Sequence, residues 1–369
     1  MKQIIKFCTS PKVFVFTLIW LMVLVVLGTL AQRDIGLYAS QQKYFSSFIT
    51  WVGNILPMPG GRTALILIFL NLTFMLCTKN LWKIKKIGLL VMHIGALLLL
   101  IGGGLTAIFS SEGNMAINEG DQSNYVDDYH NMELTIVNTS KDNLDEFTVF
   151  DQPILRKGNI LSHESLNFDI EIISYLKNCE AQRRTSHAGI QYKGMLKNFI
   201  LSELKPEKEN SQNRPGIMFR IPNSSGVDEI YGLFLGQSIV QTATINSQDY
   251  ELLIRRKRTY LPFTIELLDF KKVLYPGTGI AKSYSSEVNL IEKGVSRRVL
   301  IEMNKPLRHR GYTFFQSSFI ESQEGETTVL AAVKNYGRLF PYISSIIMCV
   351  GLLIHLTMKL PGLFNKRTI

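Results

Sequence analysis

The stretch from Ile87 to Ser111, IGLLVMHIGALLLLIGGGLTAIFSS, decides the fold of this chain. Its 25 residues include no Asp, Glu, Lys or Arg. A helix that crosses the hydrocarbon core of a bilayer needs roughly 17–25 mostly apolar residues, at ~1.5 Å of rise per residue. The stretch therefore predicts a transmembrane helix, and the chain is expected to be an integral membrane protein.

Three further uncharged apolar runs lie outward from this one, at 13–31, 63–78 and 339–358. The first is longer than the apolar part of a typical signal peptide, and Gln32-Arg33-Asp34 is a poor cleavage context, so we expect a retained anchor. The second has only 16 residues, and its Asn71 would prefer a helix–helix contact to lipid. A buried core helix is the alternative for this run. We predict four transmembrane helices, three before a large domain and one after it.

The formal net charge of +10 is distributed unevenly over the 369 residues. Residues 112–338 contain 27 basic and 29 acidic side chains, whereas the rest contains 13 basic and one acidic. Positive charge that flanks apolar runs is typical of membrane topology and not of a nucleic-acid-binding face. The segments 1–12, 79–86 and 359–369 hold basic residues and no acidic ones, so the positive-inside rule predicts that they are cytoplasmic. Both termini would then lie on the cytoplasmic side of the plasma (inner) membrane. Residues 32–62 and 112–338 would lie on its outer, periplasmic or extracytoplasmic side.

The loop 32–62 has an apolar pattern of its own. Helical spacing relates Phe45, Phe48, Ile49, Val52, Ile55 and Leu56. This pattern predicts an amphipathic helix in the outer membrane interface, with Tyr44 and Trp51 at headgroup depth. We expect no function for it beyond anchoring.

The 112–338 domain has the alternation typical of strands. Residues 168–172 and 263–267 alternate strictly, and two strand patterns flank a turn at Glu292-Lys293-Gly294. These patterns predict a mostly antiparallel β domain. Its charge is lopsided, with 4 basic and 14 acidic residues over 112–180, and 23 basic and 15 acidic residues over 181–338.

Three clusters carry much of this basic excess. They are Arg255–Arg258, Arg297-Arg298 and Arg308-His309-Arg310. Such runs are either solvated faces or a surface for an anionic partner, such as lipid headgroups or the propionates of a porphyrin.

Motifs for enzyme chemistry are absent from the sequence. It has no GxSxG, HExxH, P-loop or Rossmann fingerprint, and its four cysteines form no CxxC or CxxCH. No catalytic residue is therefore assigned, and whether the chain is an enzyme stays open.

His93 is the candidate site residue, because an ionisable group inside a span is costly and indicates a function. It lies about 10 Å from the cytoplasmic end of its helix. Imidazole is an axial ligand of haem iron, so His93 is a candidate metal ligand; the alternative is a neutral histidine bonded to a neighbouring helix. Gly95 and 102–104 offer room for close packing or for a flat ring. For His355, at similar depth, packing is favoured; the sequence leaves open whether His355 or His309 contacts haem.

Residues 304–318, NKPLRHRGYTFFQSS, resemble the N-x-P-L-x-x-x-G-Y-x-F-Y-Q-S signature of the ResB (CcsB) family of cytochrome c biogenesis proteins. Residues 283–288, SYSSEV, and the helix that carries His93 are also similar to that family, as is the order of spans. Physically, Gly311 suits a tight corner and the aromatic residues a β core, so we interpret the signature as structural.

The resemblance implies a function. ResB proteins act with a ResC (CcsA) partner in System II, which moves haem across the membrane and attaches it to the CxxCH thiols of apocytochrome c. This chain has no Trp-rich haem-binding motif, so it would be a non-catalytic or auxiliary subunit of the haem lyase complex. Haem b would bind transiently at the interface with the partner, with His93 as one axial ligand. The alternatives are a non-haem, membrane-anchored assembly or interaction protein with an exported β domain, and a transporter permease.

Overall fold

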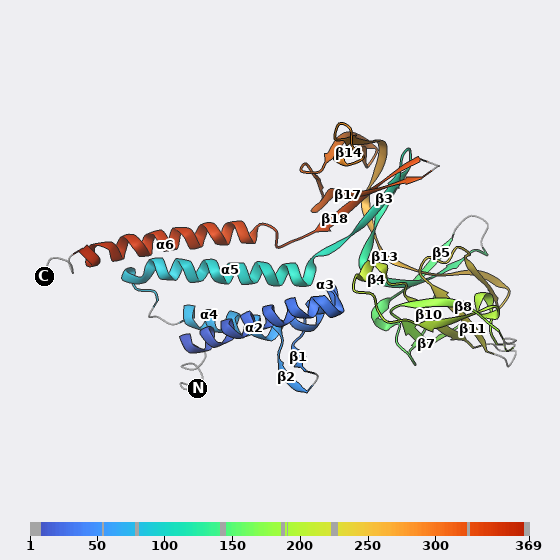
Figure 1. Ribbon diagram of the computed structural model, residues 1–369, viewed down its shortest axis with the longest axis horizontal. Helices are drawn as coiled ribbons and strands as arrows, with labels where there is room; N and C mark the ends of the chain where they lie inside the picture. Colours follow the sequence, from blue (N-terminus) through green and yellow to red (C-terminus); the bar gives the residue numbers. More distant parts are fainter. Residues whose placement is uncertain are drawn as a thin grey trace. The chain divides into compact units, whose positions relative to one another are not determined.

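The computed structural model describes most of the chain, and Figure 1 gives the arrangement of its elements. The described residues are 9–53, 55–77, 81–140, 145–185, 189, 191–222, 228–322 and 325–364. The chain forms two compact units. The helical unit comprises Met1–Ser111, His309–Tyr312 and Val333–Ile369, and the β unit comprises Glu112–Arg308 and Thr313–Ala332.

Some residues used to predict the membrane orientation lie outside the described residues. They are Lys2, Lys6, Lys79, Lys366 and Arg367. The predicted segments 1–12, 79–86 and 359–369 are therefore only partly described.

Three helices are long and apolar enough to cross a membrane. They are α2 (Pro11–Ile35), the stretch Ile84–Phe109, which contains the 3-10 turn η2 (Ile84–Lys86) and α5 (Ile87–Phe109), and the Phe340–Leu360 part of α6 (Phe340–Phe364). The fourth apolar helix, α4 (Gly61–Cys77), has 17 residues. In α2 the Ser10 side chain accepts a hydrogen bond from the Lys12 N–H, and Pro11 occupies the first turn, as expected for a helix start.

Helices α5 and α6 pack as an antiparallel pair through glycines spaced seven residues apart (Figure 1). A Cβ at Gly95 would lie 2.6 Å from Met348 Cγ, and one at Gly88 would lie 2.8 Å from His355 Cα. A Cβ at Gly102 would also overlap Phe340. Seven residues are about two turns, so the three glycines share one face of α5. Hydrogen is therefore the only side chain that fits at this contact, and the two backbones approach closely.

Helices α2 and α4 form a second pair, and the chain between them turns back along α2. Short helix α3 (Leu37–Ser40) and π-helix η1 (Gln41–Phe45) follow α2 directly. The Ser40 hydroxyl donates to the Gly28 carbonyl at 2.6 Å, which fixes this return against α2. A Cβ at Gly61 would lie 2.8 Å from Phe45 Cα, so η1 ends where α4 begins. The predicted neighbour contact of Asn71 is confirmed, because its amide donates to the Ser10 carbonyl at 3.1 Å.

A β-hairpin separates η1 from α4, and the predicted amphipathic helix over 45–56 is wrong. Strands β1 (Ile49–Val52) and β2 (Leu56–Pro59) pair in register, with Gly53 at φ +63° in the turn. Pro57 and Pro59 have no N–H for a helix ladder, and β1 consists of β-branched and aromatic residues that favour strands. Trp51 stays about half exposed, whereas Tyr44 is buried in the helical unit and not at a surface.

The β unit holds two larger sheets and one small one (Figure 1). The first has the order β15-β14-β13-β4-β3-β18-β17-β16, with β5 added to β4 and β12 added to β13; the second has the order β11-β10-β7-β6; β8 pairs with β9. The strands are β3 (Ser111–Asn118), β4 (Gln122–Asn138), β5 (Glu146–Asp151), β6 (Ile160–Leu161), β7 (Ile170–Leu176), β8 (Cys179–Arg183), β9 (Phe199–Glu203), β10 (Gly216–Ile221), β11 (Glu229–Phe234), β12 (Gln241–Ile245), β13 (Gln248–Leu274), β14 (Ala281–Glu292), β15 (Val295–Glu302), β16 (Leu307–His309), β17 (Tyr312–Ser322) and β18 (Gly325–Lys334). Short 3-10 turns η3 (Gln152–Ile154), η4 (Gly194–Lys197) and η5 (Asn210–Gln212) connect some of them. Strands β4, β7, β10 and β13 pair antiparallel with their neighbours, as predicted.

The main core lies between the two larger sheets. It joins Leu134 of β4 and Leu252 of β13 to Ile172 of β7 and Phe219 of β10, all of them fully buried. The predicted hairpin after β14 is confirmed, because Lys293 and Gly294 have φ of +49° and +79° between paired strands β14 and β15. Two consecutive positive φ values are typical of a type I′ turn.

Candidate functional site

His93 lies in the second turn of α5, half-buried, with one ring nitrogen bonded to its own helix. Its Nδ1 is 2.7 Å from the Leu89 carbonyl oxygen. A carbonyl only accepts, so Nδ1 carries the hydrogen and Nε2 of the neutral ring holds the lone pair. Histidines that bind metals usually donate their other N–H in this way, to a backbone carbonyl or a carboxylate. The contact therefore leaves Nε2 in the form that coordinates a metal.

The face of α5 that carries His93 is not the face that packs on α6. His93 lies roughly 140–160° around the helix from Gly88 and Gly95, at 3.6 residues per turn. His355 lies on the other side of that contact, with its backbone nitrogen and Cα against Gly88. The two histidines thus lie on different sides of the α5–α6 contact.

The glycines near His93 have two roles. Gly95 and Gly102 serve close packing against α6, the first of the two predicted alternatives. A Cβ at Gly103 or Gly104 would have no atom from beyond its own helix turn within 4 Å. Gly104 lies about three helical turns from His93. The space beside Gly104 is therefore not next to the imidazole.

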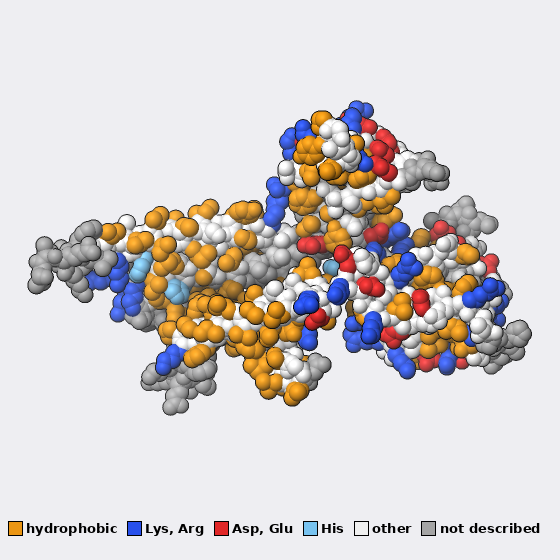
Figure 2. All heavy atoms as spheres, viewed as in Figure 1, with side chains coloured by type: hydrophobic (Ala, Val, Ile, Leu, Met, Phe, Trp, Pro, Cys, Tyr) orange, Lys and Arg blue, Asp and Glu red, His pale blue; other side chains and the backbone are white. Residues whose placement is uncertain are grey.

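Histidine and basic side chains gather near one end of the helical unit (Figure 2). Lys83, Lys85 and Lys86 precede α5, and Lys359 lies late in α6. Hydrophobic side chains cover most of the remaining helix surface in this view. Among the described residues, no group of three or more His, Cys, Asp or Glu is placed to hold a metal ion. The described part of the helical unit therefore offers dispersed imidazoles and an apolar surface, and no group of three metal ligands.

The basic cluster at 255–258 is ion-paired inside the β unit. Arg255 Nε lies 2.7 Å from Glu133 Oε1, and the side chain of Glu133 is only 4% exposed. Across the same strands, Lys257 pairs with Asp151 at 2.6 Å and Arg258 pairs with Asp127 at 3.2 Å. Burial raises the pKa of Asp127, and Arg258 opposes that shift. Arg255, Lys257 and Arg258 are thus paired with carboxylates from the acidic first part of the domain.

The 304–318 signature forms a turn and part of the β core, as predicted. Arg310 and Gly311 have φ of +49° and +81° between β16 and β17. Tyr312 and Phe314 are buried, and Phe314 packs edge-on against Phe263 of β13.

Gln316 of the signature lies in a buried polar cluster that joins three strands. The Ser286 hydroxyl donates to Gln316 Oε1 at 2.6 Å and lies 2.8 Å from Thr328 Oγ1. Gln316 Nε2 donates to the Ser318 carbonyl at 3.1 Å. Both polar atoms of the Gln316 amide are thus hydrogen-bonded within the fold, as expected for a structural residue. Sequence reasoning missed Thr328 because its strand pattern gives no sign of a polar partner.

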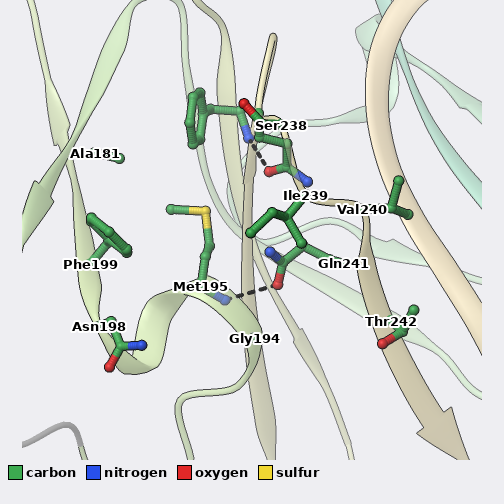
Figure 3. Close-up of a pocket in the computed structure, with 12 residues that line it drawn as sticks. Ala181, Gly194, Met195, Asn198, Phe199, Ser238, Ile239, Val240, Gln241 and Thr242 are labelled. Atoms are coloured by element: carbon green, nitrogen blue, oxygen red, sulfur yellow. Dashed lines mark hydrogen bonds between the residues drawn. The ribbon is translucent and has the colours of Figure 1, made fainter.

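A pocket in the β unit was also missed by the sequence analysis (Figure 3). Its volume is about 540 Å³. Its lining residues are Ala181, Gly194, Met195, Asn198, Phe199, Phe234, Gln237, Ser238, Ile239, Val240, Gln241 and Thr242. None of them is ionisable, so the pocket suits an apolar group with a few hydrogen bonds, and not acid–base chemistry. Residues this far apart in sequence meet only through the fold.

Two elements hold the walls of this pocket together. The Gln241 side chain accepts a hydrogen bond from the Met195 N–H at 2.8 Å, which ties η4 to the start of β12. Figure 3 shows Met195 and Phe199 on one side of the opening and Ile239 and Val240 on the other.

Comparison with known proteins finds a matching family and a similar protein. The model of the ResB-like family matches residues 77–153 and 226–333, which include His93 and the 304–318 signature. The chain is also similar to Protein NrfI of Wolinella succinogenes, with 24% identity over 299 residues. That alignment covers 78% of this chain and 29% of NrfI, so the chain spans less than a third of its relative's length.

Proposed function

The chain belongs to the ResB-like family, and we propose that it is a membrane subunit that handles haem in cytochrome c biogenesis. In this proposal it moves haem b from the cytoplasmic side with a ResC/CcsA-like partner of System II. The pair presents haem together with apocytochrome c, whose CxxCH thiols receive it. Family membership supports the role in cytochrome c biogenesis. In this proposal the chain supplies binding and positioning, as an auxiliary subunit of the haem lyase complex.

The proposal includes four spans in the inner membrane, with both termini cytoplasmic. Three long apolar helices support it, and the fourth span is the one that α4 would make. Helices α3, η1 and α4 contain 4, 5 and 17 residues, and η1 ends against the start of α4. A span needs ~20 residues, and α4 alone is shorter than that. In our proposal α3 and η1 add to the length of α4, although the β1–β2 hairpin lies between η1 and α4 in the sequence.

The observation that carries the haem assignment is the bond from His93 Nδ1–H to the Leu89 carbonyl. It orients the ring and holds Nε2 as an acceptor, which is what an iron ligand requires. His93 would supply one nitrogen ligand to a bound haem, and a further ligand would come from another residue. His355 lies beyond the α5–α6 contact, which supports our proposal that the further ligand comes from the partner and that haem binds at the interface between the two proteins.

Absorbance of the purified complex tests this assignment. His93→Ala should remove most of the co-purified haem and its Soret band, while His355→Ala should leave the band in place. Added imidazole should restore part of the band in His93→Ala, because it enters the vacated ligand position. Full haem content in His93→Ala, with normal cytochrome assembly, would make His93 a packing residue.

A non-haem interaction protein is the second candidate function, and the uncharged pocket of the β unit favours it. This function predicts no haem in the complex of the unaltered chain with its partner. The same absorbance measurement therefore separates the two functions.

A further inference from the structure

Strand β12 lies at an exposed position on the side of β13, and its backbone geometry is fixed by a tight hairpin. Asn246 and Ser247 have φ of +51° and +62°, and Ile245 pairs with Gln248 on either side of them. The closing pair of a two-residue hairpin is hydrogen-bonded, and such pairs alternate with non-bonded ones along an antiparallel ladder. Ala243 and Gln241 are therefore the next bonded positions, and the N–H and C=O groups of Thr242 and Thr244 point away from β13.

In the described part of the chain, β12 pairs with no strand other than β13. Among the residues that the structure describes, no backbone hydrogen bond uses the main chain of Thr242 or Thr244, and both side chains are exposed. The segment 239–245, IVQTATI, contains no charge and no proline. Natural edge strands usually carry charged residues or proline, which prevent pairing with another chain. Because β12 carries neither, it can accept a further strand.

The 540 Å³ pocket lies beside this edge (Figure 3). Val240, Gln241 and Thr242 belong both to the strand or its approach and to the pocket lining. A strand added at ~4.8 Å from β12 would project alternate side chains to one face. One apolar side chain of the added strand would then reach the pocket, against Met195 and Phe199.

We propose that β12 and this pocket bind an extended, unfolded polypeptide by strand addition, with an apolar side chain held in the pocket. Main-chain bonds to Thr242 and Thr244 provide affinity for any extended chain, and the pocket selects among sequences. This inference rests on the proposed function for the identity of the ligand, an apocytochrome c that is still unfolded because it has not received haem.

The position of the pocket relative to the family match supports a selective role. Met195 and Phe199 lie between the two stretches that match the family model, whereas β12 lies within the second. The pocket wall formed by Met195 and Phe199 is thus outside the part of the chain that matches the family model, whereas β12 is inside it. A wall that is not common to the family is suited to select the polypeptide that this particular chain binds.

Proline scanning of the edge tests strand addition. Thr242→Pro removes an outward N–H while leaving the bonds between β12 and β13 in place, because proline is tolerated on an exposed edge. Thr242→Ala is the matched control, since it loses the same side chain and keeps the N–H. The probe is a fluorescently labelled, haem-free apocytochrome c, and its anisotropy is measured with the full chain in detergent. We expect Kd to rise about tenfold for Thr242→Pro and less than about twofold for Thr242→Ala.

A second variant tests the pocket. Val240→Asp places a charge at the lining without changing the hairpin, and should also weaken binding about tenfold. Thermal midpoints of the variants should match that of the unaltered chain, which shows that the β unit is folded.

The outcomes separate this inference from the proposed function. Binding that is unchanged in Thr242→Pro, or lost equally in Thr242→Ala, would overturn strand addition. If the chain holds haem through His93 but binds no unfolded apocytochrome, this inference fails and the haem function stands. If His93→Ala keeps its haem while Thr242→Pro alone loses the probe, the haem assignment fails and strand addition stands.

Discussion

At Gly311 the backbone determines which residue the position accepts. Its φ is +81°, and no other atom lies within 4 Å of where a Cβ would stand, so conformation and not crowding is the constraint. An L-residue in this region costs ~1–2 kcal/mol, and β-branched residues cost more. We expect Gly311→Val to lower the thermal midpoint and the steady-state amount of protein, and Gly311→Asn to be better tolerated. Normal abundance with lost cytochrome assembly would instead give the signature a direct role.

Cys179 is a buried thiol whose chemistry follows from its surroundings. Burial raises its pKa to about 11, against an ordinary 9.0, and Arg214 partly opposes the shift. The folded-state pKa is above the unfolded one, so the stabilising contribution is complete below pH 9 and is lost as the pH rises towards 11. We expect iodoacetamide at about pH 8 to leave Cys179 unmodified in the folded chain and to alkylate it in denaturant. Rapid alkylation of folded protein, measured by mass spectrometry, would contradict its burial.

At the residue scale the sequence predicted the positive φ of Gly311, because few other residues tolerate that conformation. His93 stands out because a titratable group inside an apolar run is costly, and its role as a ligand stays a prediction. The direction of the His93 ring was not predictable. It depends on the bond to the Leu89 carbonyl, which any residue at position 89 would supply.

Among the elements, α5 offers a matched pair of glycines for testing helix packing. A Cβ at Gly95 would meet Met348 Cγ at 2.6 Å and the Ser344 carbonyl at 3.0 Å, whereas one at Gly103 would meet nothing within 4 Å. We therefore expect Gly95→Val to weaken the α5–α6 contact and lower the thermal midpoint in detergent. Gly103→Val makes the same chemical change on the same helix and should have little effect. Equal losses in both variants would point to helix propensity and not to packing.

Elements were predictable where one signal dominates. The length of the uncharged apolar runs located α2, α5 and α6, and the strand patterns on both sides of a turn located the β14–β15 hairpin. The segment 45–56 carries two signals, helical spacing of apolar residues and a following Pro-x-Pro, and the hairpin shows that the second prevails. The pocket gave no signal at all, because its walls come from β8, η4, β9 and β12.

For the whole molecule, the orientation in the membrane is the prediction with the broadest consequences. Lys83 and its neighbours should be cytoplasmic, and Ser211 in the β unit should be outside, because basic loops are retained inside. Alkaline phosphatase fused near Ser211 should be active, and the same enzyme fused at Lys83 should be inactive. The reverse pair of activities would overturn the topology and, with it, the cytoplasmic side of His93.

The α5–α6 contact also has a consequence for how the chain is made. Helix α5 ends at Phe109 and α6 begins at Phe340, so the whole β unit is synthesised between the two halves of one contact. At ~5–20 residues per second, a ribosome needs roughly 10–50 s for that interval. During this interval the face of α5 that carries Gly88, Gly95 and Gly102 is not yet covered by α6. Any other helix with small residues could pack on that face during this interval, so α6 has to reach α5 before a competing helix does.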